Sequence, residues 1–305
     1  MQPYSRRTRL LLAALVMLSL SKIANAQTTN FLDISLAGQH DDNISRSFLS
    51  SDRRSDNSAH LALSAGRLWQ LPNLDTVTLF AELGTHHFRT LKGLNNNSLA
   101  LGASYQRKFG LGAFAPTLSA SLSWTLEDSR TQVRTRELNT FEINFRKRLN
   151  NAWDFSAGVS GEQSYGKYDG AKYANMYSPH NDIFDFTQAS AFSQISYTLA
   201  NYSTLNASYS YVDGNTVSSA LAPNPRLLAI AQALTIDAAY PAPIGRNIVS
   251  YTLETKAHIW TVDWSYPLGR DTSLTAAYSR QDIAARAGVD YSNDRISLTI
   301  MHILK

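Results

Sequence analysis

The chain has 305 residues, of which 17% are charged and none is cysteine. The lack of cysteine excludes disulfide bonds, thiolate catalysis and Cys-ligated metals. Four of the 28 lysine and arginine residues lie within residues 1–26, so the rest of the chain has 24 basic and 24 acidic side chains. Because that part has no net charge and no polybasic stripe, we do not expect nucleic acid as a partner.

The first 26 residues have the three parts of a removable export signal. Three arginines form a basic start, an apolar stretch follows over residues 10–20, and Ala24-Asn25-Ala26 is a small-residue cleavage site. The apolar stretch is shorter than the roughly 20 residues that a membrane-spanning helix needs. We therefore predict a cleavable signal peptide at 1–26, followed by one domain at 27–305.

Beyond residue 26, apolar residues recur at every second position over most of the chain. Residues 117–127 illustrate the pattern, because Leu, Ala and Trp alternate there with Ser, Thr and Glu. Successive side chains of a strand point to opposite faces, so this spacing predicts strands with one apolar and one polar face. Twelve strands are predicted, at 31–40, 58–69, 75–88, 96–108, 116–127, 134–149, 153–168, 184–199, 203–213, 250–267, 271–284 and 294–304.

The links between these strands alternate in length. Short links rich in Pro, Gly and Asn, which suit tight turns, follow the even-numbered strands. Longer polar links follow the odd-numbered strands, and the longest covers 214–249. Outer-membrane barrels combine an even strand number with short periplasmic turns and long extracellular loops. The sequence thus predicts an all-β, antiparallel up-and-down transmembrane β-barrel in the bacterial outer membrane. Both termini would be periplasmic, with 12 strands, or 14 if residues 229–240 join the wall.

At the end of the first predicted strand the chain reads Gln39-His40-Asp41-Asp42-Asn43. With this element, residues 27–305 resemble bacterial outer-membrane β-barrel proteins, among them uncharacterised proteobacterial barrels and the barrel of surface lipoprotein assembly modifiers. The resemblance implies insertion by the barrel-assembly machinery and an outer face in contact with outer-membrane lipid. The chain departs from this class at its end, where Lys305 stands in place of the usual terminal aromatic residue. That departure concerns the efficiency of assembly rather than the fold.

The polar faces of the predicted strands carry charges that must point into the barrel, because a charge facing lipid near mid-membrane costs about 2–4 kcal/mol. Two interpretations of these charges stay open. They could line a water-filled pore that favours anions or sugar acids, or they could pair across the bore as a scaffold. The candidate lumen and selectivity residues are Glu82, Arg134, Arg136, Glu142, Arg146, Arg148 and Glu162.

We expect a passive, porin-like channel for small hydrophilic solutes rather than an enzyme. One alternative is a lipid or lipopolysaccharide hydrolase, for which His86 and His87, with Ser98 on the next strand, would be the candidates. Another alternative is an assembly or export barrel for lipoprotein or polysaccharide. We expect no metal or cofactor, although Asp41 and Asp42 could together ligate a hard cation.

Overall fold

The computed structural model describes residues 27–73, 75–167, 182–222, 225, 230–285 and 288–304. The predicted signal peptide and most of the 169–183 link lie outside these residues. The described chain forms a single 13-stranded sheet. Its strands are β1 (Gln27–Asp41), β2 (Asp56–Gln70), β3 (Thr76–Phe88), β4 (Asn96–Lys108), β5 (Thr117–Ser129), β6 (Arg136–Arg148), β7 (Trp153–Gly166), β8 (Phe186–Thr198), β9 (Thr204–Leu221), β10 (Ala233–Ile236), β11 (Ile248–Pro267), β12 (Thr272–Ala285) and β13 (Tyr291–Ile303).

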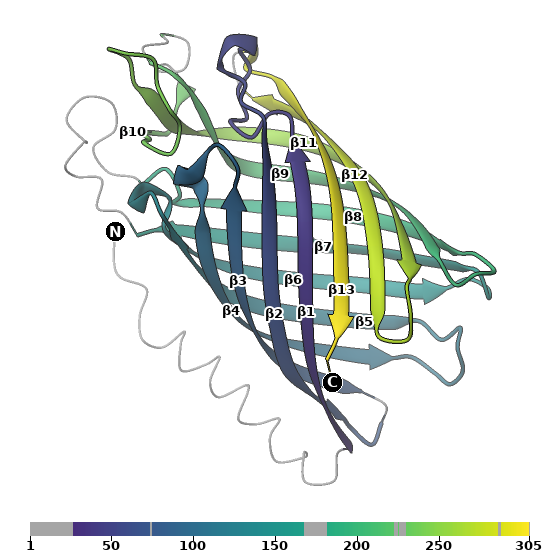
Figure 1. The fold of residues 1–305 in the computed structure, drawn as a ribbon. Coiled ribbons are helices and arrows are strands. Elements are labelled where there is room, and N and C mark those ends of the chain that lie inside the picture. The colour runs from purple at the N-terminus through teal and green to yellow at the C-terminus, as the bar shows by residue number, and fades with distance from the viewer. Residues whose placement is uncertain are drawn as a thin grey trace.

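All strands except β10 form a closed antiparallel barrel (Figure 1). Strand β1 pairs with both β2 and β13, and β9 pairs with β11, so the wall has no free edge. A closed ladder satisfies every backbone polar group within the wall, as a membrane requires. The predicted 12-stranded barrel is therefore confirmed, and the 14-stranded alternative is wrong for the described chain. Besides residues 214–221 of β9 and 248–249 of β11, the 214–249 segment contributes the short strand β10, which lies outside the wall and pairs with residues 249–252 of β11.

The hairpin of β9 and β11 is longer than the rest of the wall. Strand β8 pairs with β9 only as far as Gly214, and β12 pairs with β11 only from Thr255. Beyond those points, residues 215–221 and 248–254 continue to pair with each other. The sequence pattern places residues 215–221, 248 and 249 in a link and residues 250–254 in a predicted strand, whereas the structure makes all of them part of a projecting hairpin. We call this barrel end, where the longer links lie, the loop end, and the opposite end the turn end.

Within the described part of the chain, three short 3₁₀ helices lie at the loop end: η2 (Ser50–Asp52), η3 (Lys92–Leu94) and η4 (Gln132–Arg134). Among the residues that the structure describes, no helix is long and apolar enough to cross a bilayer. At the turn end, the predicted tight links are present, and Gly110 and Gly112 adopt the positive φ angles that glycine tolerates.

The two faces of the wall have the polarity expected from the alternation. Large apolar side chains such as Leu83, Val262 and Leu298 lie on the outer face with half or more of their surface exposed. The buried apolar residues gather instead at the loop end, in four clusters. The apolar core of this protein thus lies across one mouth of the barrel, and the outer face offers a belt suited to hydrocarbon.

Candidate functional site

The projecting hairpin crosses the loop-end mouth, and both of its faces are covered. On one face Val249, Tyr251 and Leu253 pack with Val289, which lies just before β13. On the other face Ile248 packs against residues of the link between β3 and β4. We call the described residues of 215–254 the lid. Because apolar residues from links all around the rim pack on it, the lid closes over the bore.

An ion pair joins the lid to the opposite side of the barrel. Asp237, whose side chain is fully buried, lies between β10 and β11, and its Oδ2 accepts from Arg134 Nη2 at 2.7 Å and from Arg134 Nε at 2.8 Å. The same oxygen accepts from Ser250 Oγ at 2.5 Å, and Oδ1 accepts from the backbone N–H of Ala239 at 2.9 Å. The ring of Tyr240 lies 5.2 Å from the guanidinium carbon. We call Arg134 and Asp237 the latch.

Burial alone would lower the pKa of Arg134, but Tyr240 and Asp237 beside it raise that pKa above its usual value. Burial likewise raises the pKa of Tyr240. Arg134 and Tyr240 therefore keep their protons at physiological pH. In the latch, the charged guanidinium of Arg134 faces a carboxylate that also accepts from Ser250 and Ala239. The sequence places Arg134 on a strand facing the pore, whereas the structure places it in η4 with its charge turned to the lid.

The Asp41-Asp42-Asn43 element ties the first loop to β13. Asn43 is fully buried, and its amide donates to Ser292 O at 3.0 Å. Asp41 accepts from the backbone of Asn43, and Asp42 accepts from the backbone N–H of Asp294 at 2.7 Å. Each carboxylate thus has protein donors in place of a cation. In the described part of the chain, no group of three or more His, Cys, Asp or Glu residues is arranged to hold a metal ion.

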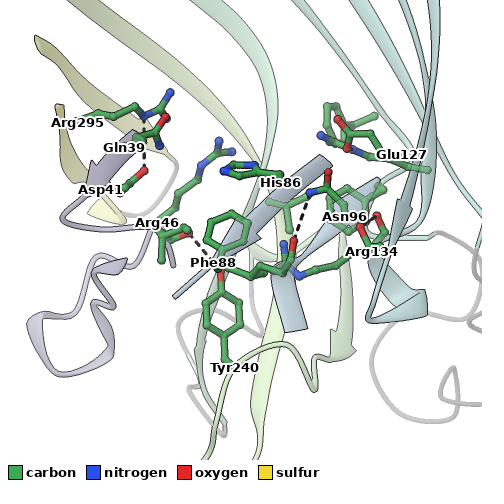
Figure 2. A pocket seen from close by; sticks show the side chains of 17 residues that line it. Gln39, Asp41, Arg46, His86, Phe88, Asn96, Glu127, Arg134, Tyr240 and Arg295 are labelled. Atoms are coloured by element: carbon green, nitrogen blue, oxygen red, sulfur yellow. Dashed lines mark hydrogen bonds and ion pairs between the residues drawn. The ribbon is translucent and has the colours of Figure 1, made fainter. Parts of the chain in front are cut away.

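Beneath the lid lies a chamber of about 330 Å³, which we call the loop-end chamber (Figure 2). Its ceiling comes from the lid and the surrounding links, and its walls come from the inner faces of β1, β3, β4, β5, β6, β8 and β13. Two ion pairs lie in its walls: Arg136 Nε to Glu127 at 2.7 Å, and Arg295 Nε to Asp41 at 3.6 Å.

A second chamber, of about 460 Å³, lies at the turn end. Lys108, Arg146 and Arg148 line it together with Asp154. As the strand pairing predicts, both arginines approach that aspartate, Arg146 Nη2 at 3.3 Å and Arg148 Nε at 4.0 Å. Three cationic groups thus line the chamber against one carboxylate, and exposed ion pairs of this kind contribute little stability. The turn-end chamber is therefore positively charged.

The remaining candidate residues lie on the inner face between the two chambers. Glu82 and Glu142 alternate with lipid-facing neighbours such as Leu83 and Phe141, and Glu162 follows the same rule on β7. No ion pair involving Glu82 or Glu142 occurs within the described residues. The middle of the bore is thus acidic and the turn end is basic.

Inner-face phenylalanines lie flat against glycines of neighbouring strands. In three cross-strand pairs, a Cβ added to the glycine would come within 2.5 Å of the ring. The ring occupies the space that the missing side chain leaves, so it covers the wall instead of filling the bore. The pairs are Phe31 with Gly66, Phe80 with Gly102, and Phe192 with Gly158.

The two histidines considered for a hydrolase differ in position. His86 lines the loop-end chamber, whereas His87 is exposed on the outer face, where its Nε2 lies 3.2 Å from Thr85 Oγ1 and its Nδ1 lies 3.3 Å from Asn95 Nδ2. Asn95 Oδ1 accepts from the backbone N–H of Phe88 at 2.8 Å, so its NH₂ group faces the histidine. Nδ1 of His87 must then accept, which leaves the proton on Nε2.

This tautomer of His87 does not suit a general base that activates a serine nucleophile. A general base must take the proton of the hydroxyl, but His87 already directs a proton at Thr85. Ser98, the serine considered from the sequence, makes no hydrogen bond to either histidine among the described residues. The arrangement therefore gives no support to a hydrolase.

The sequence pattern did not single out four charged residues of the site: Arg46, Lys108, Asp237 and Arg295. Lys108 and Arg295 occupy lumen-facing positions of predicted strands, so the same alternation would have identified them. Arg46 and Asp237 lie in links, where no periodicity indicates direction.

No protein-family model matches this sequence, and no curated protein sequence matches it. Similar solved structures include an outer membrane channel from Pseudomonas putida F1, which is 13% identical with a TM-score of 0.57 over 90% of this chain and 96% of that chain. The KdgM porin, solved in complex with disordered oligogalacturonate, is 10% identical with a TM-score of 0.43 over 88% of this chain and 98% of its own.

The outer membrane phospholipase of Salmonella typhi is 14% identical with a TM-score of 0.42, over 88% of this chain and 90% of its own. Of these three structures, the channel from Pseudomonas putida alone exceeds a TM-score of 0.5. At 13% identity this similarity shows a shared fold, and that fold is the outer-membrane β-barrel.

Proposed function

We propose that the protein is a passive outer-membrane channel for small hydrophilic solutes, closed at one mouth by its lid. In this proposal the turn end and both termini face the periplasm, the loop end faces the outside, and the outer face contacts lipid after insertion by the barrel-assembly machinery. The observation that carries the proposal is that charged side chains face a chamber at each end of the bore. The fold shared with a protein described as a channel agrees with it.

The charges suggest how a solute would pass. Lys108, Arg146 and Arg148 would attract anions into the turn-end chamber, because a charged and narrow cleft concentrates counter-ions. Glu82 and Glu142 would oppose strongly anionic solutes farther along the bore. Passage to the outside would then require the lid to move, because the lid covers the loop-end chamber.

Planar bilayer recordings test this proposal. Purified protein should give discrete conductance steps, and the double change Arg146→Gln and Arg148→Gln should lower the anion-to-cation permeability ratio, by roughly tenfold at low salt. The effect should shrink at high salt, because ions screen the charges. Arg280→Gln is the matched control, since Arg280 makes its ion pairs on the exposed outer face.

Two results would overturn the proposal. One is a lack of discrete conductance both in the wild type and in a variant whose latch is removed. The other is an unchanged permeability ratio after both arginines of the turn-end chamber are replaced.

A further inference from the structure

Arg46 has an unusual backbone for its residue type. Its φ is 51°, in the left-handed region that favours glycine and asparagine, and its backbone N–H donates to Asn43 O at 2.8 Å. The buried amide of Asn43 holds this turn through Ser47 O and Ser292 O. The first loop therefore imposes a strained conformation on an arginine, and strain of this kind gathers at functional sites.

The side chain of Arg46 enters the loop-end chamber. Figure 2 shows it extending toward His86, and both residues line the cavity. No ion pair of Arg46 occurs within the described residues. The two carboxylates that line this chamber, Asp41 and Glu127, are already paired with Arg295 and Arg136. Among the lining residues, Arg46 thus has no acid of its own, and Glu162, outside the lining, is a carboxylate that its charge reaches.

Arg295 supplies a second guanidinium group to the lining of the chamber. Its Nε lies 3.6 Å from a carboxylate oxygen of Asp41, so the Nε–carboxylate pair is loose. Guanidinium groups recognise carboxylates through paired N–H donors.

The rest of the chamber suits a small polar ring. The rings of His86 and Phe88 lie 4.3 Å apart, and Phe184 and Tyr240 add aromatic surface. Gln39 and Asn96 contribute amide groups to the lining. Aromatic walls with a few polar groups are typical of small-molecule sites, and about 330 Å³ is at the small end of their range.

We infer that the loop-end chamber binds a small hydroxylated carboxylate of about the size of a monosaccharide acid, held by Arg46 and Arg295. This inference rests on the proposed function in naming the class of solute for the same bore. The hydroxyl groups of the solute would meet the amide groups of Gln39 and Asn96, and its ring would lie against the aromatic surface.

Calorimetric titration of D-glucuronate into the full chain in detergent tests the inference, with D-glucose as the neutral probe. The wild type should bind glucuronate and not glucose. Arg46→Gly should weaken glucuronate binding by roughly tenfold or more, because it removes a charge-assisted pair of donors. Glycine suits the positive φ, so this variant should fold at least as well as the wild type. Arg46→Lys should lie between the two.

Arg53→Gly is the matched control, because Arg53 is an exposed arginine of the same loop. Equal binding of glucose and glucuronate, or wild-type affinity in Arg46→Gly, would overturn the inference. Calorimetry needs no conductance, so the two proposals can fail separately. Binding without conductance would refute the channel, and conductance without binding would refute this site.

Discussion

Strand β11 belongs to two regions of the molecule, and its two halves differ in burial. Its first six residues, Ile248 to Leu253, are all buried, although three of them are polar or hydroxylated. From residue 258 onward exposed residues alternate with partly buried ones, as in the rest of the wall. The first half lies in the lid and has tertiary partners on both faces. The second half has lipid-facing positions on one side and the bore on the other.

This difference indicates how the two regions are stabilised. The wall depends on a closed backbone ladder, in which every strand has two neighbours. The lid depends instead on long-range tertiary contacts with the links around the rim, such as the latch and the cluster around Leu253. Part of a protein can open locally without global unfolding. We therefore expect the lid to respond to single substitutions that leave the wall intact.

The largest expected effect comes from Asp237→Ala. It leaves the guanidinium of Arg134 without its carboxylate, and the loss of one partner of a buried ion pair costs about 3–5 kcal/mol. The substitution destabilises the closed state of the lid by this amount. The open state should therefore become populated, and the mean conductance in planar bilayers should rise severalfold.

Asp282→Ala is the control for the latch, because Asp282 pairs with Arg280 on the exposed outer face. It should leave the conductance unchanged. If Asp237→Ala conducts like the wild type while keeping the heat-resistant gel mobility of a folded barrel, the latch does not hold the lid.

A somewhat smaller effect is expected from Leu253→Ala, which compares the two halves of β11 directly. Leu253 is 2% exposed in the lid, and removing such a buried side chain costs about 2–5 kcal/mol. Val262→Ala, at a 50% exposed position of the wall, should cost less than about 1 kcal/mol.

Hydrogen exchange of the β11 amides measures this comparison. Leu253→Ala should reduce protection at residues 248–253 and leave protection beyond residue 258 unchanged. A uniform loss of protection along the whole strand would mean that lid and wall form one cooperative unit.

The wall could be predicted from the sequence because its environment has a period of two. Each wall residue faces either hydrocarbon or the bore, so the type of side chain reports the face directly. The lid could not be predicted this way. Ser218 and Ser219 are buried there by partners distant in sequence, and a serine-rich stretch without alternation resembles a solvated loop.

The residues of the candidate site also differ in whether the sequence alone could predict them. Arg146 and Arg148 were identified because they occupy inner positions of a regular strand, and their proximity to Asp154 follows from strand pairing. The partner of Arg134 could not be foreseen, since Asp237 follows it by 103 positions and lies in a link. The direction of Arg46 depends on a turn that Asn43 builds with β13, which no local pattern indicates.

The smallest expected effect concerns the wall itself, through Gly102→Ala. A Cβ at this position would lie 2.2 Å from Cζ of Phe80, and inserting a methyl group into a packed site costs about 1–3 kcal/mol. The ring of Phe80 should leave its place against β4 and turn into the bore, which would reduce the conductance. Gly161→Ala is the control, since no atom lies within 4 Å of its added Cβ.

The double variant Phe80→Ala with Gly102→Ala distinguishes a blocked bore from a damaged wall. Without the ring, the added methyl group has space, and the conductance should return to at least the wild-type level. If the double variant conducts as poorly as Gly102→Ala alone, the defect lies in strand pairing. The glycine would then be needed for the ladder rather than for keeping an aromatic ring out of the path of the solute.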